Sequence, residues 1–431
     1  MEATLREPVA AGRIRDLVKG SRIRVFGWTA LFVVAIGLAV INYRELVSEV
    51  LINIPSAPVF HETALASGST DARVYSWAGT YYLLSTEDRD PQKALWYFKK
   101  AVELNPLYYQ HWSEIGAAYE MLGDYDNAVD AYRNTVTLSP NSYQSHWSLA
   151  NCLLRKGDYD QSVVEFRRYL EIDRTSAGYV FDLLNRVNGD NLEKMSRDLL
   201  PLSGPARADL ALFIAGKGDA TLAVNTWQGM SGTDKQESKE QGLRLVGYLL
   251  TVRDYDRAKT IWSEFAPKNE TGGPVVNGSF ENPIEDYPSG FGWRFSAGKQ
   301  PAISLSADKP NRGKQSLLLN FSAVGTHSPE KLEQLVAPLT GGVYKLSYSA
   351  KATDLAIGAT PMIEVFGEDG KALVSDQPAQ GTFDWTHREA IFTVTADQKA
   401  VKLSIAIPDV ATSRTGLAGK LWLDDFSIEK R

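Results

Sequence analysis

The chain has 431 residues, which at about 150 residues per domain predicts two or three domains. Apolar residues make up 44% and charged residues 23%, a composition typical of globular proteins that excludes global disorder. The net charge of −6 provides no basic field to attract a polyanion, so no nucleic-acid partner is expected. With one cysteine, Cys152, and five scattered histidines, a disulfide scaffold and a structural zinc protein are excluded.

The first 43 residues divide into a basic part and an apolar part. Residues 1–24 carry six Lys and Arg side chains against three acids, and residues 25–43 contain no charge. A helix over 25–43 would be roughly 28 Å long, close to the ~30 Å hydrocarbon thickness of a bilayer. Basic residues before the span place the N-terminus in the cytoplasm. We therefore predict a cytoplasmic tail at 1–24, a single transmembrane anchor at 25–43, and an inner-membrane protein whose bulk is periplasmic or extracytoplasmic.

Two alternatives to the anchor stay open. A cleaved signal peptide needs a small-x-small site just after the apolar run, whereas Asn42-Tyr43-Arg44-Glu45 follows it. A buried helix of a soluble domain is rarely apolar on every side for five turns. Residues 44–74 are predicted to form a linker and the first helices of the next region.

A period of 34 residues dominates the middle of the chain. The tetrapeptide Gly-Asp-Tyr-Asp at 123–126 recurs at 157–160, and a proline and an aromatic residue keep the same step, as Pro106, Pro140, Phe98, Tyr132 and Phe166. This period is typical of helical hairpins that stack on one another. The frame beginning at Tyr109 carries a characteristic pattern, in Trp112, Ile115, Gly116, Tyr119, Ala128, Tyr132 and Pro140.

On these residues, 75–176 resemble three tetratricopeptide repeats, which implies paired helices stacked as an α-solenoid. Gly116 and Ala128 are expected to let the helices approach closely, with Tyr132 filling the space between them and Asp124 in the turn before the second helix. The pattern decays but continues through 177–266, which we predict to be degenerate helical repeats. The whole solenoid would then hold five or six helix pairs between residues 56 and 266.

The first helices of such a solenoid form its concave surface, where a protein partner is expected to bind. The candidate partner-binding residues there are Gln110, Glu114, Gln144, Trp147, Asn151 and Arg155. Trp147 is prominent because tryptophan is enriched in binding hot spots, and packing against its neighbours is the alternative. The basic side chains with which some family members clamp a C-terminal carboxylate are missing, with Asn151 alone in a suitable place.

The last third of the chain changes character. Residues 267–274 form a turn-rich linker, and 275–431 contain short β-prone segments separated by Gly, Pro, Asn and Asp. Strands are predicted at Gln315–Ser322, Val343–Lys351, Pro361–Phe366, Glu389–Thr395, Val401–Ile407 and Lys420–Ile428. Six to nine strands in about 155 residues are typical of a β-sandwich. The fold class is therefore a multidomain α-then-β chain: one transmembrane helix, an α-solenoid and a β-sandwich.

The two ends of this region carry motifs. Val-Asn-Gly-Ser-Phe-Glu at 276–281 opens it, and Trp-Leu-Asp-Asp-Phe-Ser-Ile at 422–428 closes it. In this order they resemble the jelly-roll carbohydrate-binding modules of the galactose-binding-like superfamily. The resemblance implies a structural calcium at Glu281 and Asp424. Independently, Asp424 is expected on the same strand face as Trp422, Phe426 and Ile428, where a carboxylate must be paired or bound to a cation. A hydrogen-bonded or arginine-paired aspartate is the alternative.

Sugar binding needs exposed aromatic rings beside polar side chains. The candidates for carbohydrate binding are Trp293, Tyr348, Trp385 and His387, although Trp293 and Trp385 also occupy places where a core tryptophan is common. Exposure of Trp293, Tyr348 and Trp385 would favour sugar binding, and burial of all three would favour a role in assembly.

No catalytic residues are predicted. Asp424 and Asp425 are adjacent on a strand, so they should point to opposite faces and make a poor acid–base pair. We interpret the chain as a non-enzymatic, membrane-anchored adaptor that binds a protein partner and a glycan, as in envelope polysaccharide assembly or export. The alternatives are a structural scaffold that binds no sugar, and a glycan-active enzyme with an unrecognised site.

Overall fold

The structure, a computed structural model, describes residues 29, 31–40, 43, 69–266, 274–284, 290–295, 303–321, 330–355, 361–407 and 418–431. Within the predicted anchor, Thr29, residues 31–40 and Tyr43 are helical, and the remaining residues of 25–43 lie outside the described part. So do residues 1–24, 44–68 and 267–273. Among the described residues, no helix combines the length and apolarity needed to cross a membrane.

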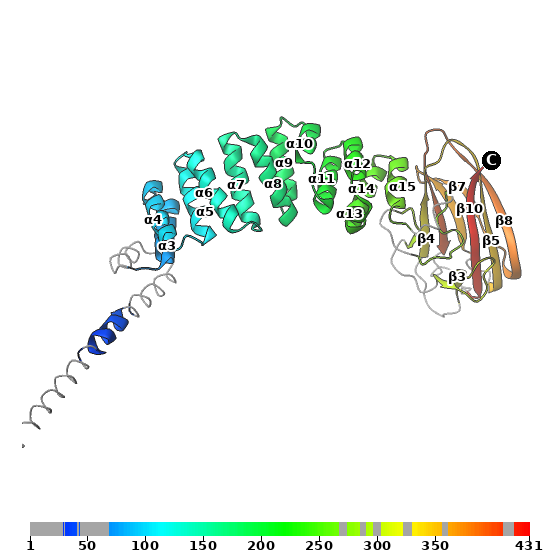
Figure 1. The fold of residues 1–431 in the computed structure, drawn as a ribbon. Coiled ribbons are helices and arrows are strands. Elements are labelled where there is room, and N and C mark those ends of the chain that lie inside the picture. The colour runs from blue at the N-terminus through cyan, green and yellow to red at the C-terminus, as the bar shows by residue number, and fades with distance from the viewer. Residues whose placement is uncertain are drawn as a thin grey trace, which may run out of the picture. The chain divides into compact units, whose positions relative to one another are not determined.

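The chain divides into two compact units, Met1–Thr175 and Ser176–Arg431. In the first unit, the helices α3 to α8 form three successive pairs (Figure 1). They are α3 (Ala72–Leu84) with α4 (Pro91–Leu104), α5 (Tyr109–Met121) with α6 (Tyr125–Leu138), and α7 (Tyr143–Lys156) with α8 (Tyr159–Ile172). The prediction of paired helices in this region is confirmed.

An aspartate caps the second helix of each of these pairs. The side chains of Asp90, Asp124 and Asp158 each accept a hydrogen bond from the backbone N–H three residues further on. The first N–H groups of a helix have no partner within it, so these carboxylates define where α4, α6 and α8 begin. The predicted role of Asp124 is confirmed.

Close approach between paired helices depends on small residues. A Cβ atom at Gly116 of α5 would lie 2.7 Å from Cε1 of Tyr132 in α6, which is 3% exposed. A Cβ atom at Gly79 of α3 would likewise meet the ring of Phe98 in α4. An aromatic ring thus packs directly on the backbone of the facing helix, as the spacing predicts.

The second unit begins with further helices. They are α9 (Ala177–Val187), α10 (Leu192–Leu199), α11 (Gly204–Gly216), α12 (Ala220–Gln228), α13 (Gly232–Glu237), α14 (Lys239–Thr251) and α15 (Tyr255–Ser263). Aspartate caps recur in this degenerate part, where Asp219 opens α12 and Asp254 opens α15. The helical hairpin therefore persists after most of the repeat's other signature residues have been lost.

The rest of the second unit is a β-sandwich of two antiparallel five-stranded sheets (Figure 1). The first sheet has the order β1-β4-β9-β6-β7, with β1 (Arg294–Phe295), β4 (Glu330–Val336), β9 (Val401–Ile407), β6 (Met362–Gly367) and β7 (Ala372–Asp376). The second has the order β2-β3-β10-β5-β8, with β2 (Ile303–Ser306), β3 (Ser316–Asn320), β10 (Lys420–Lys430), β5 (Gly342–Leu355) and β8 (Gly381–Val394). This is the expected jelly roll, and all six predicted strands are present.

The two sheets enclose one apolar core. On β5, Tyr344, Leu346 and Tyr348 point into it, so the alternate residues Ser347 and Ser349 point to the opposite face. We call the face of the second sheet turned away from this core the outer face. It carries the candidate site described below.

Candidate functional site

The candidate partner-binding residues lie on the first helices of two pairs. Gln110 and Glu114 are on α5, and Gln144, Trp147, Asn151 and Arg155 are on α7. Gln110, Gln144 and Arg155 are exposed, and the other three are half-buried. We call these six residues the first-helix surface.

Trp147 packs within its own helix pair. Its ring centroid lies 5.7 Å from that of Phe166 and 5.2 Å from that of Tyr169, both on α8. Asn151 likewise donates its side-chain N–H to the Trp147 carbonyl oxygen, at 2.8 Å. Trp147 therefore helps to join α7 to α8, whereas the Asn151 hydrogen bond stays within α7, and both side chains also reach the surface.

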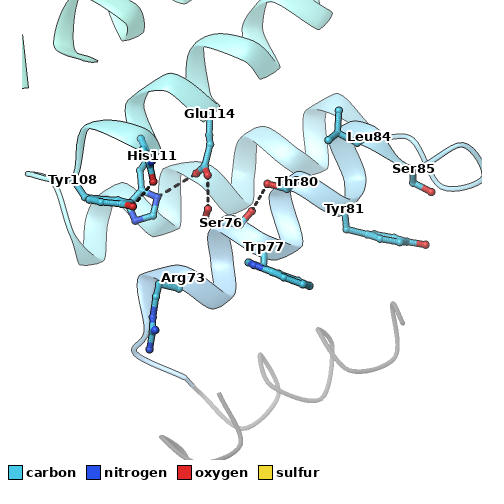
Figure 2. Close-up of a pocket in the computed structure, with 11 residues that line it drawn as sticks. Arg73, Ser76, Trp77, Thr80, Tyr81, Leu84, Ser85, Tyr108, His111 and Glu114 are labelled. Atoms are coloured by element: carbon cyan, nitrogen blue, oxygen red, sulfur yellow. Dashed lines mark hydrogen bonds and ion pairs between the residues drawn. The ribbon is translucent and has the colours of Figure 1, made fainter. Parts of the chain in front are cut away.

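A pocket of about 600 Å³ adjoins the first-helix surface on α3 and α5 (Figure 2). Glu114 lies in its wall and accepts hydrogen bonds from the Ser76 hydroxyl at 2.5 Å and from His111 Nδ1 at 3.2 Å. Figure 2 shows Trp77 and Tyr81 projecting from α3 along the same pocket. The Glu114 carboxylate thus joins the first two helix pairs, which limits its freedom to contact a partner.

In the sandwich, two of the four carbohydrate-binding candidates are core residues. Trp293 is 2% exposed, stacks on Phe280 and donates Nε1–H to the Asn277 carbonyl oxygen at 3.0 Å. Tyr348 is fully buried and stacks on Phe426 with ring centroids 5.1 Å apart. Neither ring can be stacked by a sugar, so the prediction that these two bind carbohydrate is wrong.

The Tyr348 hydroxyl instead completes a half-buried polar network. It donates to Asp376 Oδ2 at 2.6 Å and accepts from Arg388 Nε at 3.1 Å, while Arg388 also donates to both Asp376 oxygens. Burial and the adjacent Asp376 carboxylate raise the pKa of Tyr348, which keeps this hydroxyl protonated as a donor. The network fixes β5 and β8 to the edge strand β7.

The other two candidates, Trp385 and His387, are brought together. Both lie on β8 and line a groove of about 730 Å³ on the outer face, in which Trp385 is half-buried and His387 exposed. Ser347 and Ser349 of β5 are also in its lining, together with Asn311 and Asp425. We call this the outer groove.

A β-bulge in β10 shapes one side of the outer groove. The pairing of β10 with β5 shifts register between Asp424 and Ser427, and Asp425 has a φ of 56°. Leu423 and then Phe426 therefore both face the core. The expectation that Asp424 shares a face with Phe426 and Ile428 is wrong, because the extra residue moves Asp424 to the outer side of the strand.

The same bulge overturns the expectation that Asp424 and Asp425 point apart. Asn311 contacts both: its backbone N–H donates to Asp424 Oδ2 at 3.0 Å, and its side-chain Nδ2 donates to Asp425 Oδ2 at 2.6 Å. Burial and the neighbouring Asp425 charge raise the pKa of Asp424 to about 6, against the lowering effect of the Asn311 N–H. Both carboxylates thus accept hydrogen bonds from Asn311, which lies in the loop between β2 and β3.

The two predicted calcium ligands hold that same segment. Glu281 Oε1 accepts the backbone N–H groups of Lys314 and Gln315, at 2.8 and 3.2 Å, and Asp424 accepts those of Asn311 and Arg312. Among the described residues, no group of three or more His, Cys, Asp or Glu side chains is arranged to hold a metal ion. Calcium binding at Glu281 and Asp424 stays a prediction.

The polar side of the outer groove was not among the predicted binding residues. Ser347 and Ser349 alternate with Leu346 and Tyr348, and this period of two is a signal that could have placed them on the outer face. No such signal marks Asn311 or Asp425, because one comes from a loop and the other depends on the bulge.

These elements define a class: an array of helix pairs followed by a jelly-roll β-sandwich. The tetratricopeptide repeat family model matches residues 87–143 and 122–177, and together with the helix pairs it shows that this part of the chain consists of such repeats. No curated protein matches the chain in sequence.

Three solved structures illustrate the similarity of its parts. A structure of TmCBM61 in complex with β-1,4-galactotriose is 17% identical over 37% of this chain and 100% of that one, with a TM-score of 0.29. A family 16 carbohydrate-binding module is 17% identical over the same shares, with a TM-score of 0.28. The crystal structure of MamA is 24% identical over 27% of this chain and 67% of that one, with a TM-score of 0.25.

Proposed function

We propose that this protein is a non-enzymatic adaptor that binds a protein partner through its helical repeats and a glycan through its jelly roll. Tetratricopeptide repeats generally mediate protein–protein interaction, which supports the first part. The outer groove supports the second. A membrane anchor and a place in envelope polysaccharide assembly or export belong to the same proposal.

The observation that carries the glycan part is the lining of the outer groove. Trp385 offers a half-buried indole ring and His387 an exposed imidazole, and Asn311 and Asp425 add an amide and a carboxylate to the lining. Ser347 and Ser349 also line the groove, and both residues are at most 6% exposed. An aromatic face packs on the apolar face of a pyranose, and fixed polar groups bind its hydroxyls. This combination is suited to a sugar chain.

The test is binding of the full-length protein to a panel of oligosaccharides by isothermal titration calorimetry. Trp385→Ala should abolish binding without changing the thermal unfolding of the protein. Trp96→Ala is the matched control, since Trp96 is 54% exposed on α4, outside the sandwich. Absence of binding by the wild-type chain, or full binding by Trp385→Ala, would refute a glycan site in this groove.

For the protein partner, we propose the first-helix surface. A photo-crosslinking amino acid at Gln144, which is exposed on α7, should yield a covalent adduct of one defined mass in the native host. The same amino acid at Asn134, exposed on the second helix α6, is the control and should yield no such adduct. Equal adducts from both positions would contradict a binding face on the first helices.

The anchor rests on residues 25–43. Within the described helix 31–40, apolar side chains are open to solvent, with Phe32 67% and Val33 68% exposed. We propose that they contact lipid, with the N-terminus in the cytoplasm. The protein should then stay in the membrane fraction after alkaline carbonate extraction, and Phe32→Asp with Val33→Asp should release it.

The alternative function is a scaffold whose jelly roll contacts proteins only. The burial of Trp293 and Tyr348 favours this alternative, because it removes two of the three aromatic rings expected to stack on sugar. We favour glycan binding over the scaffold alternative because Trp385 is only half-buried. The calorimetric comparison above separates the two.

A further inference from the structure

The bulge in β10 directs the Asp425 carboxylate into the outer groove, whereas regular alternation along the strand would have placed this carboxylate elsewhere. Asp425, with its φ of 56°, lies in the groove lining, and its side chain is 24% exposed. Aspartate tolerates this left-handed backbone better than most residues. The groove therefore has a charged acceptor on the side formed by β10.

One oxygen of this carboxylate is held in place. Oδ2 accepts a hydrogen bond of 2.6 Å from the Asn311 side chain, whose same nitrogen lies 3.2 Å from the Ser349 hydroxyl in the groove. Among the described residues, Oδ1 accepts no hydrogen bond, so it stays available to a ligand. A fixed and partly unsatisfied acceptor is already oriented before a ligand arrives.

A cation stands beside this acceptor without neutralising it by contact. Nε of Arg312 is 4.0 Å from Asp425 Oδ2, beyond hydrogen-bond distance, and the Arg312 side chain is 84% exposed. Two neighbouring hydroxyls of one sugar ring could each donate to the carboxylate and accept from the guanidinium. One negative and one positive group side by side give no net preference for a charged polymer.

We propose that Asp425 and Arg312 are the specificity-determining pair of the outer groove, an inference that rests on the proposed function. The pair selects a neutral sugar with two adjacent free hydroxyls. Trp385 packs on the ring of this sugar. The opposite charges of the pair give neither a uronic acid nor an amino sugar an advantage over a neutral sugar. Ser347 and Ser349 of β5, which are at most 6% exposed, support this side of the groove through hydrogen bonds with Ser427 and Asn311.

The test uses the full-length protein with three probes: neutral hexose oligosaccharides, an oligogalacturonate and a chitosan oligomer. Asp425→Asn keeps the side-chain shape and the left-handed backbone, and it should weaken binding of the neutral oligosaccharide by about 10- to 100-fold, the range for hydrogen bonds to charged groups. Arg312→Gln should weaken it by a smaller factor because its side chain is more exposed. Asp369→Asn, in the exposed turn between β6 and β7, is the matched control and should leave affinity unchanged.

The outcomes separate this inference from the proposed function. If Trp385→Ala abolishes binding but Asp425→Asn and Arg312→Gln bind as the wild type does, the specificity pair is wrong and the glycan site stands. Tighter binding of the oligogalacturonate or chitosan than of every neutral oligosaccharide also overturns the inference. If the wild-type chain binds none of the probes, both proposals fail.

Discussion

Close packing at Gly116 can be tested by adding one methyl group. In Gly116→Ala, the new Cβ would lie 2.7 Å from Tyr132 Cε1 and 2.8 Å from Cδ1, whereas carbon atoms in contact prefer 3.5–4.0 Å. The ring cannot withdraw freely, because it is 3% exposed and its hydroxyl donates to Glu120 Oε2 at 2.9 Å. Either α5 and α6 move apart or this hydrogen bond is lost.

The magnitude follows from two opposing effects. Alanine is favoured over glycine inside a helix by about 1 kcal/mol. Overpacking a filled interior costs about 1–3 kcal/mol, and losing a hydrogen bond to a carboxylate costs a further 1.5–3 kcal/mol, roughly. After the gain of about 1 kcal/mol is subtracted from these two costs, we expect Gly116→Ala to lower the free energy of unfolding of the first unit by about 1.5–5 kcal/mol.

The assay is urea unfolding followed by circular dichroism at 222 nm. Gly247→Ala is the matched control, since Gly247 lies inside α14 and an added Cβ would meet no atom within 4 Å, so this variant should be slightly stabilised. Gly116→Ala combined with Tyr132→Phe should recover part of the loss, because a ring without the hydroxyl can shift. The third pair already combines Ala150 with Phe166 at the equivalent positions. A Gly116→Ala protein as stable as Gly247→Ala would refute the packing argument.

Three further perturbations have defined outcomes. Burial alone would lower the pKa of His146, but its contacts with Glu165 Oε2 (2.7 Å) and the Pro140 carbonyl oxygen (2.9 Å) raise this pKa above 6.5. The urea midpoint should therefore be highest below pH 6.5 and fall as the pH rises through the raised pKa. His146→Gln should remove this pH dependence. Tyr348→Phe should lower stability by about 1–3 kcal/mol and leave glycan affinity unchanged, whereas a changed affinity would place Tyr348 in the site. If Glu281 binds calcium, Glu281→Ala should lower the melting temperature of the sandwich more in calcium than in chelator, because the lost contacts with the Lys314 and Gln315 N–H groups are common to both conditions.

The helical repeats could be predicted from the sequence because each one is specified by local contacts. A helix cap such as Asp124 and a small residue such as Gly116 act within one hairpin of 34 residues. Residues with these roles therefore recur every 34 positions, which makes them visible in the sequence. The same holds in the degenerate part, where Asp219 and Asp254 still mark the helix starts. The helical repeats could therefore be predicted without knowing which distant segments contact one another.

The sandwich was only partly predictable, because its strands are defined by pairing with distant segments. The strand predicted from Glu389 begins at Gly381, since the first half of β8 is an exposed edge with polar residues. β4 (Glu330–Val336) was not predicted, because its three charged residues interrupt the apolar pattern to which the core residues Leu332 and Val336 belong. β1, β2 and β7 are five residues or shorter and carry too few residues for a periodic signal.

The candidate site shows a sharper limit. Aromatic residues mark both cores and sugar platforms, so composition alone could not separate Trp293 and Tyr348 from Trp385. What separates them is which face of which strand each residue occupies. On β10 that assignment is changed by a single inserted residue at Asp425, and no period of two can reveal a bulge that interrupts it.

Two interpretations of Glu281 and Asp424 lead to different predictions: these carboxylates hold the loop at 311–315 by themselves, or they also bind a calcium ion. Carboxylates that accept backbone N–H groups stabilise a loop without a metal, because an N–H cannot bind a cation. Yet Asp424 is fully buried beside a second carboxylate, and this burial, together with the Asp425 charge, raises the pKa of Asp424 to about 6. A bound cation would lower that pKa and stabilise the loop further. Calcium should then raise the melting temperature most near pH 7, where Asp424 is charged, and least near pH 5. An equal loss for Glu281→Ala with calcium and with chelator would instead leave the amide contacts as the sole reason for both carboxylates.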